Sequence, residues 1–456
     1  MKKLRFFLAL YIAKASRLAM RLLGRNATHL PGVIAVKICP DFMGQLKLPE
    51  TVIAVTGTNG KTTVSNLLSN VLTACGYKVT NNSLGSNIQA GVATVLLTDS
   101  DLLGRAKKDI AVLEVDERSS LLIYPYVKPD FLICNNLMRD SLKRNAHTEF
   151  IQYIINRALP ESTKLILNAD DPVCCGLGSE NQQKTYFGLD IEKPETSVAP
   201  FVQDIVYCPK CGSELKAEYI RYNHIGRFAC CGCDYASPPP DFVVTDANRE
   251  NNTFTVLHNN EYHSYKLPND NIVNIYNSCS AVALLHQLGI APDKIEKAFD
   301  TLKIVKFRFD QTDTGKGKIT LQASKGQNPI ACARSFSYVA SCPGSNKLLF
   351  ILVDDKPDNT NNSENVCWLY DCDYSYLTSE SIGQIVFSGP RCKDHYLRAL
   401  IAGVAPEKIV LCNDFSGGAH LTNINNFEDI YILHDVYLGS EANQLRDKLL
   451  AEKEGA

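Results

Sequence analysis

The chain has 456 residues, enough for about three domains of ~150 residues each. Hydrophobic residues make up 45% of it and charged residues 21%, which excludes a largely disordered or collagen-like chain. With 47 basic against 49 acidic side chains the net charge is −2, so binding of a nucleic-acid duplex through many phosphate contacts is not expected. No uninterrupted apolar run reaches the ~20 residues that a membrane-spanning helix needs.

Residues 1–24 predict a basic amphipathic helix. Apolar side chains alternate there with Lys2, Lys3, Arg5, Lys14, Arg17 and Arg21. The apolar stretch that begins at Phe6 is interrupted by Lys14, and no small-residue cleavage site follows cleanly. Three interpretations stay open: a helix packed on the body of the protein, a helix resting on an anionic membrane surface, or a cleaved targeting peptide.

The chain contains 17 cysteines. An odd number, spread over a long chain without a convincing secretory signal, argues against a disulfide framework. We therefore expect a protein of the reducing cytoplasm, with the inner face of the cell membrane as a further location.

Strand and helix patterns alternate after residue 50. Buried-strand patterns lie at 51–56, 110–115, 131–134 and 164–167, and helical patterns at 61–75 and 149–158. This alternation predicts an α/β fold with a mostly parallel sheet covered on both faces.

The pattern breaks at 207–240, where cysteines cluster, and this segment is interpreted as an insertion. Two or three strands are expected over 242–267 and a helix over 274–288. A second α/β series follows at 347–353, 385–387, 408–411 and 430–433. We therefore expect three parts: 1–45, a basic helix and linker; 46–305, a central nucleotide-binding domain with the insertion at 205–240; and 306–456, a C-terminal Rossmann-like α/β domain.

A phosphate-binding loop is expected between the first strand and its helix. The loop comprises Gly57, Thr58, Asn59, Gly60, Lys61, Thr62 and Thr63. Glycines permit a tight turn whose N–H groups, with the helix N-terminus, hold phosphate oxygens. Lys61 can reach the terminal phosphates and the Thr62 hydroxyl can bind Mg²⁺. The loop is a variant, because Val55 stands where the common spacing has its first glycine.

Acidic residues follow the strand at 110–115. Mg²⁺ prefers carboxylate oxygens, so Glu117 and Glu114 suit a metal site beside the loop. The alternative is a solvated acidic strand end.

Four cysteines in the insertion have the spacing of a zinc ribbon. Cys208 and Cys211 form one C-x-x-C pair, and Cys230 and Cys233 form a second. Eighteen residues separate the two pairs. Four thiolates close a tetrahedral structural zinc site with no open position. Redox pairs are the alternative. A nucleic-acid role is not expected, because no cluster of basic and aromatic residues flanks the ribbon.

Taken together, these motifs resemble the Mur ligase family of ATP-dependent enzymes. The resemblance rests on the loop and on Glu117-Arg-Ser-Ser120, Asn168-Ala-Asp-Asp-Pro172, Asn274-Ile-Tyr-Asn277 and Ser388-Gly-Pro-Arg391. The ribbon, the basic N-terminal helix and Val366-Cys-Trp-Leu-Tyr-Asp371 are similar to the branch that amidates a lipid-linked precursor of peptidoglycan. This resemblance implies ATP contacts from Asn168, Asn277 and Arg308, and magnesium ligation by Thr62 and Glu117.

The same resemblance implies a reaction and a partner. ATP would phosphorylate the α-carboxylate of D-glutamate in the stem peptide of lipid II, and ammonia would displace phosphate to give D-isoglutamine. No cysteine of this chain has glycine two positions before it, so a G-x-C-x-G glutaminase elbow is not present in the sequence. Ammonia is therefore expected from a separate GatD-type glutamine amidotransferase. The resemblance implies that this chain lends an aspartate to that enzyme's triad, with Asp371 as first choice and Asp358 as second.

The sequence departs from the family at several positions. Ser141 stands where a metal-associated His or Gln is usual, and Phe307-Arg308 lacks the glycine of the family's F-G-R. The family's L-x-K-N-P is altered over 321–329, with Lys325 as the substitute lysine, and Asn365 stands where aspartate is frequent. Two alternatives follow: a Mur-type ligase that adds an amino acid, or a non-catalytic partner that has kept the nucleotide pocket. The short region before residue 46 argues against the first.

Overall fold

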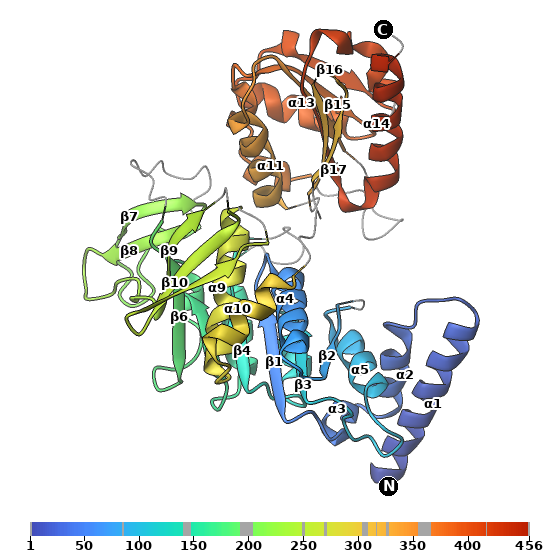
Figure 1. The fold of residues 1–456 in the computed structure, drawn as a ribbon, viewed down its shortest axis with the longest axis vertical. Coiled ribbons are helices and arrows are strands. Elements are labelled where there is room, and N and C mark those ends of the chain that lie inside the picture. The colour runs from blue at the N-terminus through green and yellow to red at the C-terminus, as the bar shows by residue number, and fades with distance from the viewer. Residues whose placement is uncertain are drawn as a thin grey trace. The chain divides into compact units, whose positions relative to one another are not determined.

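The structure is a computed structural model that describes residues 2–83, 86–139, 147–191, 204–248, 251–268, 271–302, 309–315, 317–324, 328–353, 366–415 and 417–454. These residues form two compact units, one ending near residue 304 and one built by the remainder of the chain toward the C-terminus (Figure 1).

The first unit is built on a sheet that has nine strands among the described residues. In spatial order it runs β11-β10-β9-β6-β5-β4-β1-β3-β2. The strands are β1 Thr51–Thr56, β2 Val79–Asn81, β3 Ile110–Glu114, β4 Phe131–Cys134, β5 Lys164–Asn168, β6 Lys184–Leu189, β9 Phe242–Asn248, β10 Thr253–His258 and β11 Glu261–Lys266. Neighbours from β2 to β9 pair in parallel and the last two pairs are antiparallel, so the expected mostly parallel sheet is confirmed.

Helices cover both faces of this sheet (Figure 1). One face carries α4 Lys61–Ala74, α9 Ile272–Gln287 and α10 Pro292–Asp300, and the other carries α5 Gln89–Thr98, α6 Ser120–Ile123, α7 Thr148–Ala158 and α8 Pro172–Cys175. Central strands are apolar on both sides for this reason: every residue of β3 and β4 is buried. Helix α9 is buried along most of its length because it packs on α4 and on the four strands β4, β5, β6 and β9.

Three helices precede the sheet. They are α1 Lys2–Leu22, α2 Leu30–Ile38 and α3 Phe42–Gln45. Helix α1 packs on α2, and α2 packs on α5, where Gly32 lies so close to the Ala90 carbonyl that a side chain would not fit. The predicted N-terminal helix is thus confirmed, and one of its faces belongs to the hydrophobic core of this unit.

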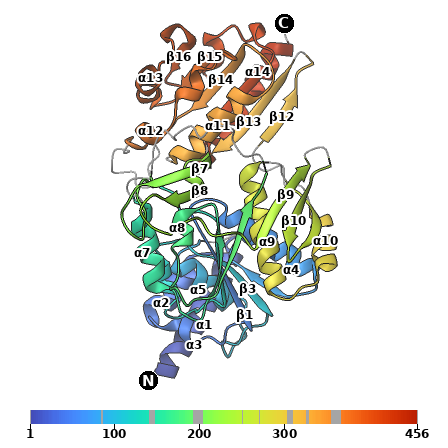
Figure 2. The same cartoon turned by 90° about the vertical axis from the view of Figure 1, so that its left-hand side faces the viewer.

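The insertion forms a two-stranded antiparallel hairpin, β7 Leu215–Tyr222 and β8 Ile225–Cys230. It lies outside the large sheet, in the chain between β6 and β9 (Figure 2).

The second unit is a six-stranded α/β domain in its described residues, with strand order β12-β13-β17-β14-β15-β16. The strands are β12 Phe309–Asp313, β13 Lys318–Ser324, β14 Lys347–Leu352, β15 Ile382–Ser388, β16 Ile409–Cys412 and β17 Ile430–Asp435. Only the edge strand β12 is antiparallel. Helices α11 Pro329–Ser341, α12 Trp368–Asp371 and α13 Cys392–Ile401 cover one face and α14 Gly439–Glu454 covers the other. The sequence patterns did not predict β12 and β13.

Candidate active site and zinc ribbon

The candidate active site lies where parallel strands of the first unit end. Strand β1 has β3 on one side and β4 on the other, so the strand order reverses at β1. Ligands of α/β proteins bind outside the carboxyl ends of the strands at such a point. The segments that follow β1, β3, β4 and β5 carry the polar residues of the site.

The phosphate-binding loop turns sharply between β1 and α4. Gly57 has φ +122° and Gly60 has φ +90°, a region that favours glycine. A side chain at Gly60 would also collide with the amide of Asn277 from α9. The loop therefore lies against α9, with the N-terminus of α4 open to an anion.

Two asparagines after β4 hold this loop in place. The Thr58 N–H donates to the Asn136 carbonyl at 2.8 Å, and the Asn59 N–H donates to Asn136 Oδ1 at 2.9 Å. Asn135 Nδ2 donates to Asn277 Oδ1, which joins β4 to α9. Sequence analysis missed both residues. The feature that could have predicted them is an Asn-Asn pair directly after a buried strand, at the sheet edge where ligands bind.

Lys61 lies in a buried ion pair. Its Nζ is 2.8 Å from Glu117 Oε1 and also donates to the Gly57 carbonyl. Burial acts to lower the pKa of Lys61, but the carboxylates of Glu117, Glu114 and Asp116 outweigh it and raise the pKa. Lys61 is thus held as a cation at the end of the loop. A cation held there can stabilise the charge that develops on a phosphoryl group during its transfer.

Thr62 is placed against Glu114. Its hydroxyl donates to Glu114 Oε2 at 2.8 Å, while Asn87 donates to the other carboxylate oxygen at 3.0 Å. Of the predicted magnesium ligands, Thr62 thus contacts Glu114, while Glu117 contacts Lys61. A hydroxyl and a carboxylate side by side are hard oxygen donors, so these residues fit a magnesium ion. Thr63 is exposed on the next position of α4.

Asn168, Asp170 and Asp171 are fully buried, and each hydrogen-bonds to a neighbouring segment. Asn168 donates to the Asn135 carbonyl at 2.9 Å. Asp171 accepts from the Leu137 N–H at 2.8 Å and also caps α8. Asp170 accepts from the Tyr276 hydroxyl at 2.6 Å, so it attaches β5 to α9. In this structure Asn168 acts on the segment that holds the loop.

The inserted hairpin reaches the same aspartates through His224. Its Nε2 lies 3.4 Å from Asp171 Oδ1 and its Nδ1 3.8 Å from Asp204 Oδ2. Arg139 Nη2 pairs with Asp204 at 2.9 Å. Burial acts to lower the pKa of His224, but the two carboxylates outweigh it and raise the pKa to about 9.

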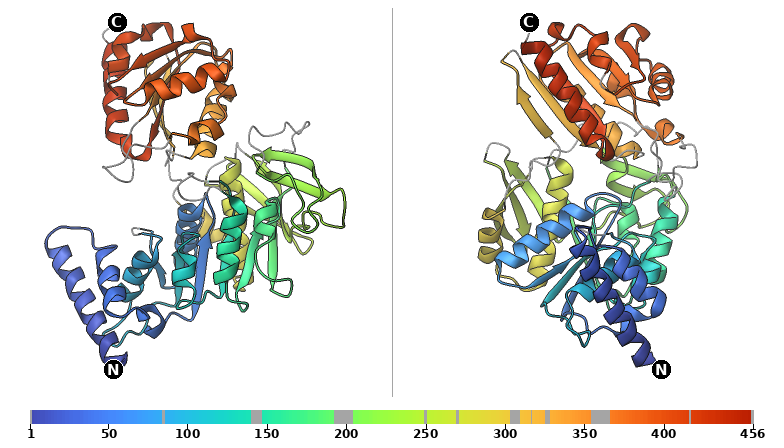
Figure 3. Two further views of the ribbon diagram at one scale, coloured as in Figure 1. Left: turned by 180° about the vertical axis from the view of Figure 1, so that it is seen from behind. Right: turned by 90° about the vertical axis from the view of Figure 1, so that its right-hand side faces the viewer.

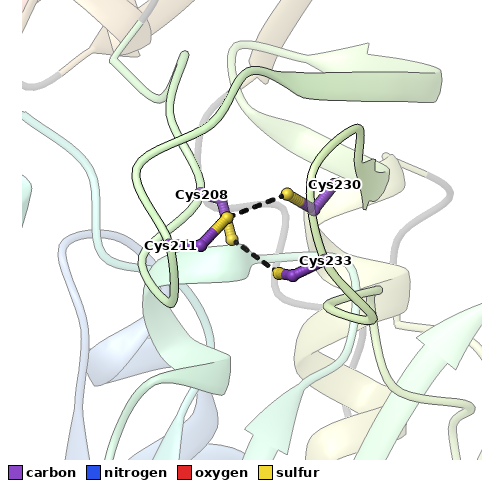
Figure 4. Close-up of side chains that lie close together, drawn as sticks. All are labelled: Cys208, Cys211, Cys230 and Cys233. Atoms are coloured by element: carbon purple, nitrogen blue, oxygen red, sulfur yellow. Dashed lines mark hydrogen bonds between the residues drawn. The ribbon is translucent and has the colours of Figure 1, made fainter.

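The four cysteines of the hairpin converge (Figure 4). The Sγ atoms of Cys208 and Cys233 are 3.7 Å apart and those of Cys211 and Cys230 3.4 Å apart, and all four lie within 4.8 Å of one another. Zn–S bonds of about 2.3 Å in a tetrahedron place sulfur atoms ~3.8 Å apart. The arrangement therefore fits a four-thiolate zinc site.

The hairpin has little apolar core of its own. Its buried hydrophobic cluster consists of Cys208, Leu215 and Phe228. Such a small core rarely holds a fold without a metal or disulfides. The hairpin lies beside α8 (Figure 2), and the Gly226 N–H donates to the Asp170 carbonyl at 2.7 Å.

In the second unit, Asp371 is the last residue of the short helix α12 and is partly exposed. Trp368 and Leu369 on the same helix are buried. Arg398 fastens the helix, since its guanidinium donates to the carbonyls of Leu369 and Cys372 at 3.0 and 2.9 Å.

A pocket lies beside α12, at the carboxyl ends of β13, β14 and β17. Its lining includes Ser324, Trp368, Arg391, His395, His434 and Asp435. Trp368 Nε1 is buried there without a hydrogen-bond partner among the described residues. Burial lowers the pKa of His395 to about 3, and its Nδ1 lies 2.6 Å from the Tyr374 hydroxyl.

Five residues singled out from the sequence lie outside the described part of the chain: Ser141, Arg308, Lys325, Asp358 and Asn365.

Comparison with known proteins agrees with this architecture. Residues 55–227 match the Mur ligase middle domain and residues 326–436 match the MurT ligase C-terminal domain. The lipid II isoglutaminyl synthase (glutamine-hydrolyzing) subunit MurT of Staphylococcus aureus strain COL is 29% identical over 89% of this chain and 90% of its own length. The subunit of the same name from Streptococcus pneumoniae R6 is 29% identical over 88% of each chain.

Solved structures show the same fold. A pseudomurein peptide ligase type C from Methanothermus fervidus is 21% identical, with a TM-score of 0.63 over 91% of this chain and 81% of its own. The MurF ligase of Thermotoga maritima in complex with ADP is 16% identical, with a TM-score of 0.61 over 93% of this chain and 84% of its own.

The fold, the phosphate loop and these matches define an ATP-dependent ligase. Residues 55–227 are thus of the Mur ligase middle-domain type and residues 326–436 of the MurT ligase C-terminal type, and over 89% of its length the chain is similar to a MurT subunit.

We expect the hairpin to depend on bound zinc. Cys211→Ser should lower the zinc content from about one ion per chain to a small fraction of that, and should lower the thermal stability, because a closed site needs all four thiolates. Zinc is measured by atomic emission and stability by calorimetry. Cys231→Ser is the control, since Cys231 is exposed and lies outside the cluster. Unchanged zinc content in Cys211→Ser would contradict the assignment.

We also expect a pH-dependent stability from His224. Its folded pKa of about 9 is raised above the ordinary value of 6.5. Its contribution is therefore fully present below about pH 6.5 and is lost as the pH rises through about 9, by up to ~3 kcal/mol.

The measurement is the free energy of unfolding from urea titrations across this pH range. His224→Gln keeps a polar side chain without the proton, so the difference between the wild type and this variant should shrink from pH 6.5 to pH 9. A difference that stays constant with pH would show that the imidazolium is not the stabilising form.

Proposed function

We propose that this chain is the synthetase subunit of a lipid II isoglutaminyl synthase. It would use ATP to amidate the α-carboxylate of D-glutamate in the stem peptide of lipid II, with ammonia from a GatD-type glutamine amidotransferase. The proposal is carried by one observation: the likeness to the MurT subunits runs through both units, while the phosphate loop keeps its cation, its hydroxyl and its adjacent carboxylates.

The chemistry requires an activated carboxylate, because a carboxylate is a poor electrophile. A carboxylate oxygen attacks the γ-phosphorus of ATP, the bond to the bridging oxygen of ADP breaks, and an acyl phosphate forms. Ammonia then attacks the carbonyl carbon, phosphate leaves and a proton is released, which gives the amide.

Residues of the first unit have distinct parts in this scheme. The loop N–H groups and the N-terminus of α4 bind the phosphates. Lys61 neutralises charge on the phosphoryl group in transit, and Glu117 orients Lys61. Thr62 with Glu114, and Glu117 nearby, would hold Mg²⁺, which when bound screens the charge of the phosphates. Asn277 keeps α9 against the loop.

The test is a reconstituted reaction. The chain, the amidotransferase, glutamine, ATP, Mg²⁺ and lipid II are expected to release phosphate and to change the mass of the stem peptide from acid to amide. An unchanged lipid mass, with a folded complex and intact glutaminase activity, would overturn the proposal. ATP consumption with a free amino acid and a soluble UDP-linked precursor would instead indicate a ligase that adds an amino acid.

Lys61→Ala should reduce phosphate release by about 100-fold or more, because removal of one preorganised charge from a phosphoryl-transfer site has effects of that size. Lys78→Ala is the matched control, since Lys78 is exposed at the far end of the β1–α4–β2 unit. Full activity of Lys61→Ala would show that the loop has been assigned the wrong role.

Asp371 is proposed to complete the partner's cysteine–histidine pair by orienting the histidine. Asp371→Asn should then abolish glutamine-dependent amidation while ammonium salts at alkaline pH still support it. Glu380→Gln, on an exposed acidic residue of the same unit, should leave both reactions unchanged. Glutamine-dependent activity at the wild-type level in Asp371→Asn would exclude this residue and leave Asp358 as the candidate.

A further inference from the structure

Helix α1 has two apolar faces, and only one of them packs on the rest of its unit. Its buried residues are Phe6, Ala9, Leu10 and Ala13. A second set, Leu4, Leu8, Tyr11, Leu18 and Leu22, is exposed. At 3.6 residues per turn the two sets fall on roughly opposite sides of the helix.

The exposed set forms a continuous stripe along the full length of the helix. Leu4 near its start is 77% exposed and Leu22 at its end is 80% exposed. Ala15 and Ala19, also exposed, fall within the same stripe. A surface helix normally presents charged or polar residues on its outer side, so five large apolar side chains in one row need an explanation.

Within its unit, α1 is an outermost element. It packs on α2, α3 and α5 through its inner face (Figures 1 and 3). The described residues of this unit place no helix or strand over the outer stripe.

The charged side chains of the N-terminal segment itself have one sign. No aspartate or glutamate occurs before Asp41, whereas eight lysines and arginines do: Lys2, Lys3, Arg5, Lys14, Arg17, Arg21, Arg25 and Lys37. On the helical wheel Lys3 and Arg21 border the apolar stripe on one side, whereas Arg17 lies further round, toward the buried face. Lys14 and Arg5 tie the helix to the body instead, because Lys14 Nζ donates to the carbonyls of Leu97 and Ser100 and Arg5 Nε donates to the carbonyl of Ile38.

A second apolar and basic element lies next to the start of α1. The turn at 101–106 exposes Leu102 by 65% and Leu103 by 53%, followed by the exposed Arg105. The Asp101 carboxylate accepts the N–H groups of Leu103 and Arg105, both at 2.8 Å, and this shapes the turn. Gly104 of the turn lies against the Phe6 ring.

We propose that the outer face of α1, aided by the turn at 101–106, docks on an anionic lipid bilayer. Leu and Tyr side chains enter the boundary between headgroups and acyl chains, and the bordering lysines and arginines contact anionic headgroups. The helix lies along the surface, since no described helix is long and apolar enough to cross a membrane. A second copy of the chain would bring like charges together, because no acidic residue occurs in the first forty positions.

This inference goes beyond the proposed amidation and does not depend on it. If both hold, docking confines the ligase to the surface where a lipid-linked acceptor lies, which raises the local concentration of that substrate.

The test is vesicle flotation of the purified full chain with phosphatidylcholine vesicles and with equimolar phosphatidylcholine–phosphatidylglycerol vesicles. Binding to the anionic vesicles should be at least about tenfold stronger, and should weaken between about 0.05 M and 0.5 M salt. Equal binding to both vesicle types, or none to either, would overturn the proposal.

Two variants locate the face. Leu8→Glu with Leu18→Glu should lower binding at least tenfold, because it places acidic groups in the stripe, and Lys3→Glu with Arg21→Glu should do the same through charge. Leu397→Glu with Ile401→Glu changes two equally exposed apolar residues of α13 and should leave binding unchanged. Vesicle binding that survives the first variant would contradict the assignment.

Further measurements distinguish the other outcomes. Circular dichroism and thermal unfolding confirm that the variants fold, and phosphate release with detergent-dispersed lipid II reports the ligase separately from docking. A wild-type dimer by light scattering that Leu8→Glu with Leu18→Glu converts to a monomer, without vesicle binding, would assign the stripe to a second copy and overturn the membrane proposal.

Discussion

Two adjacent buried carboxylates, Asp170 and Asp171, connect the parts from which the candidate active site is built. Asp171 accepts the Leu137 N–H, caps α8 and faces His224 of the inserted hairpin. Asp170 accepts the Tyr276 hydroxyl of α9, and its side chain lies 3.6 Å from Arg227 of the hairpin. Burial raises the pKa of Asp170, while the hydrogen bond from Tyr276 and the nearby guanidinium groups act in the opposite direction. Removal of any one of these partners would leave a further buried polar group unpaired, at a cost in stability.

These contacts give the hairpin a role in the geometry of the phosphate loop. His224 and Gly226 contact the aspartates, Asp171 holds the backbone at Leu137, and the neighbouring Asn136 holds Thr58 and Asn59. A four-cysteine hairpin with a small apolar core can thus support the phosphate loop although its cysteines lie outside that loop. The charged centre of the site is formed separately, by Lys61 with Glu117 and by Thr62 with Glu114.

The second unit repeats the arrangement of a parallel sheet with a polar edge but carries different residues there. Its pocket is lined by two histidines, an arginine and a buried tryptophan N–H at the ends of β13, β14 and β17. Helix α12, which ends at Asp371, forms one wall and is fastened by Arg398. This fastening keeps the position of Asp371 defined, although the side chain of Asp371 is partly exposed.

The sequence by itself determined the features that depend on short-range spacing. Strands at 51–56 and 131–134, the loop at 57–63, the four-cysteine spacing and the N-terminal helix could all be predicted, because turn chemistry, ligand spacing and apolar periodicity are local properties. Only the tertiary structure decided which carboxylate meets Thr62, that Asn135 and Asn136 hold the loop, and that Asn277 lies against Gly60, since these contacts join residues far apart in the chain. The same limit holds for α1: its sequence specified two apolar faces, and the packing of α2 and α5 decided which of them is buried. Periodicity places side chains on a face of a helix, but only neighbouring elements remove that face from water.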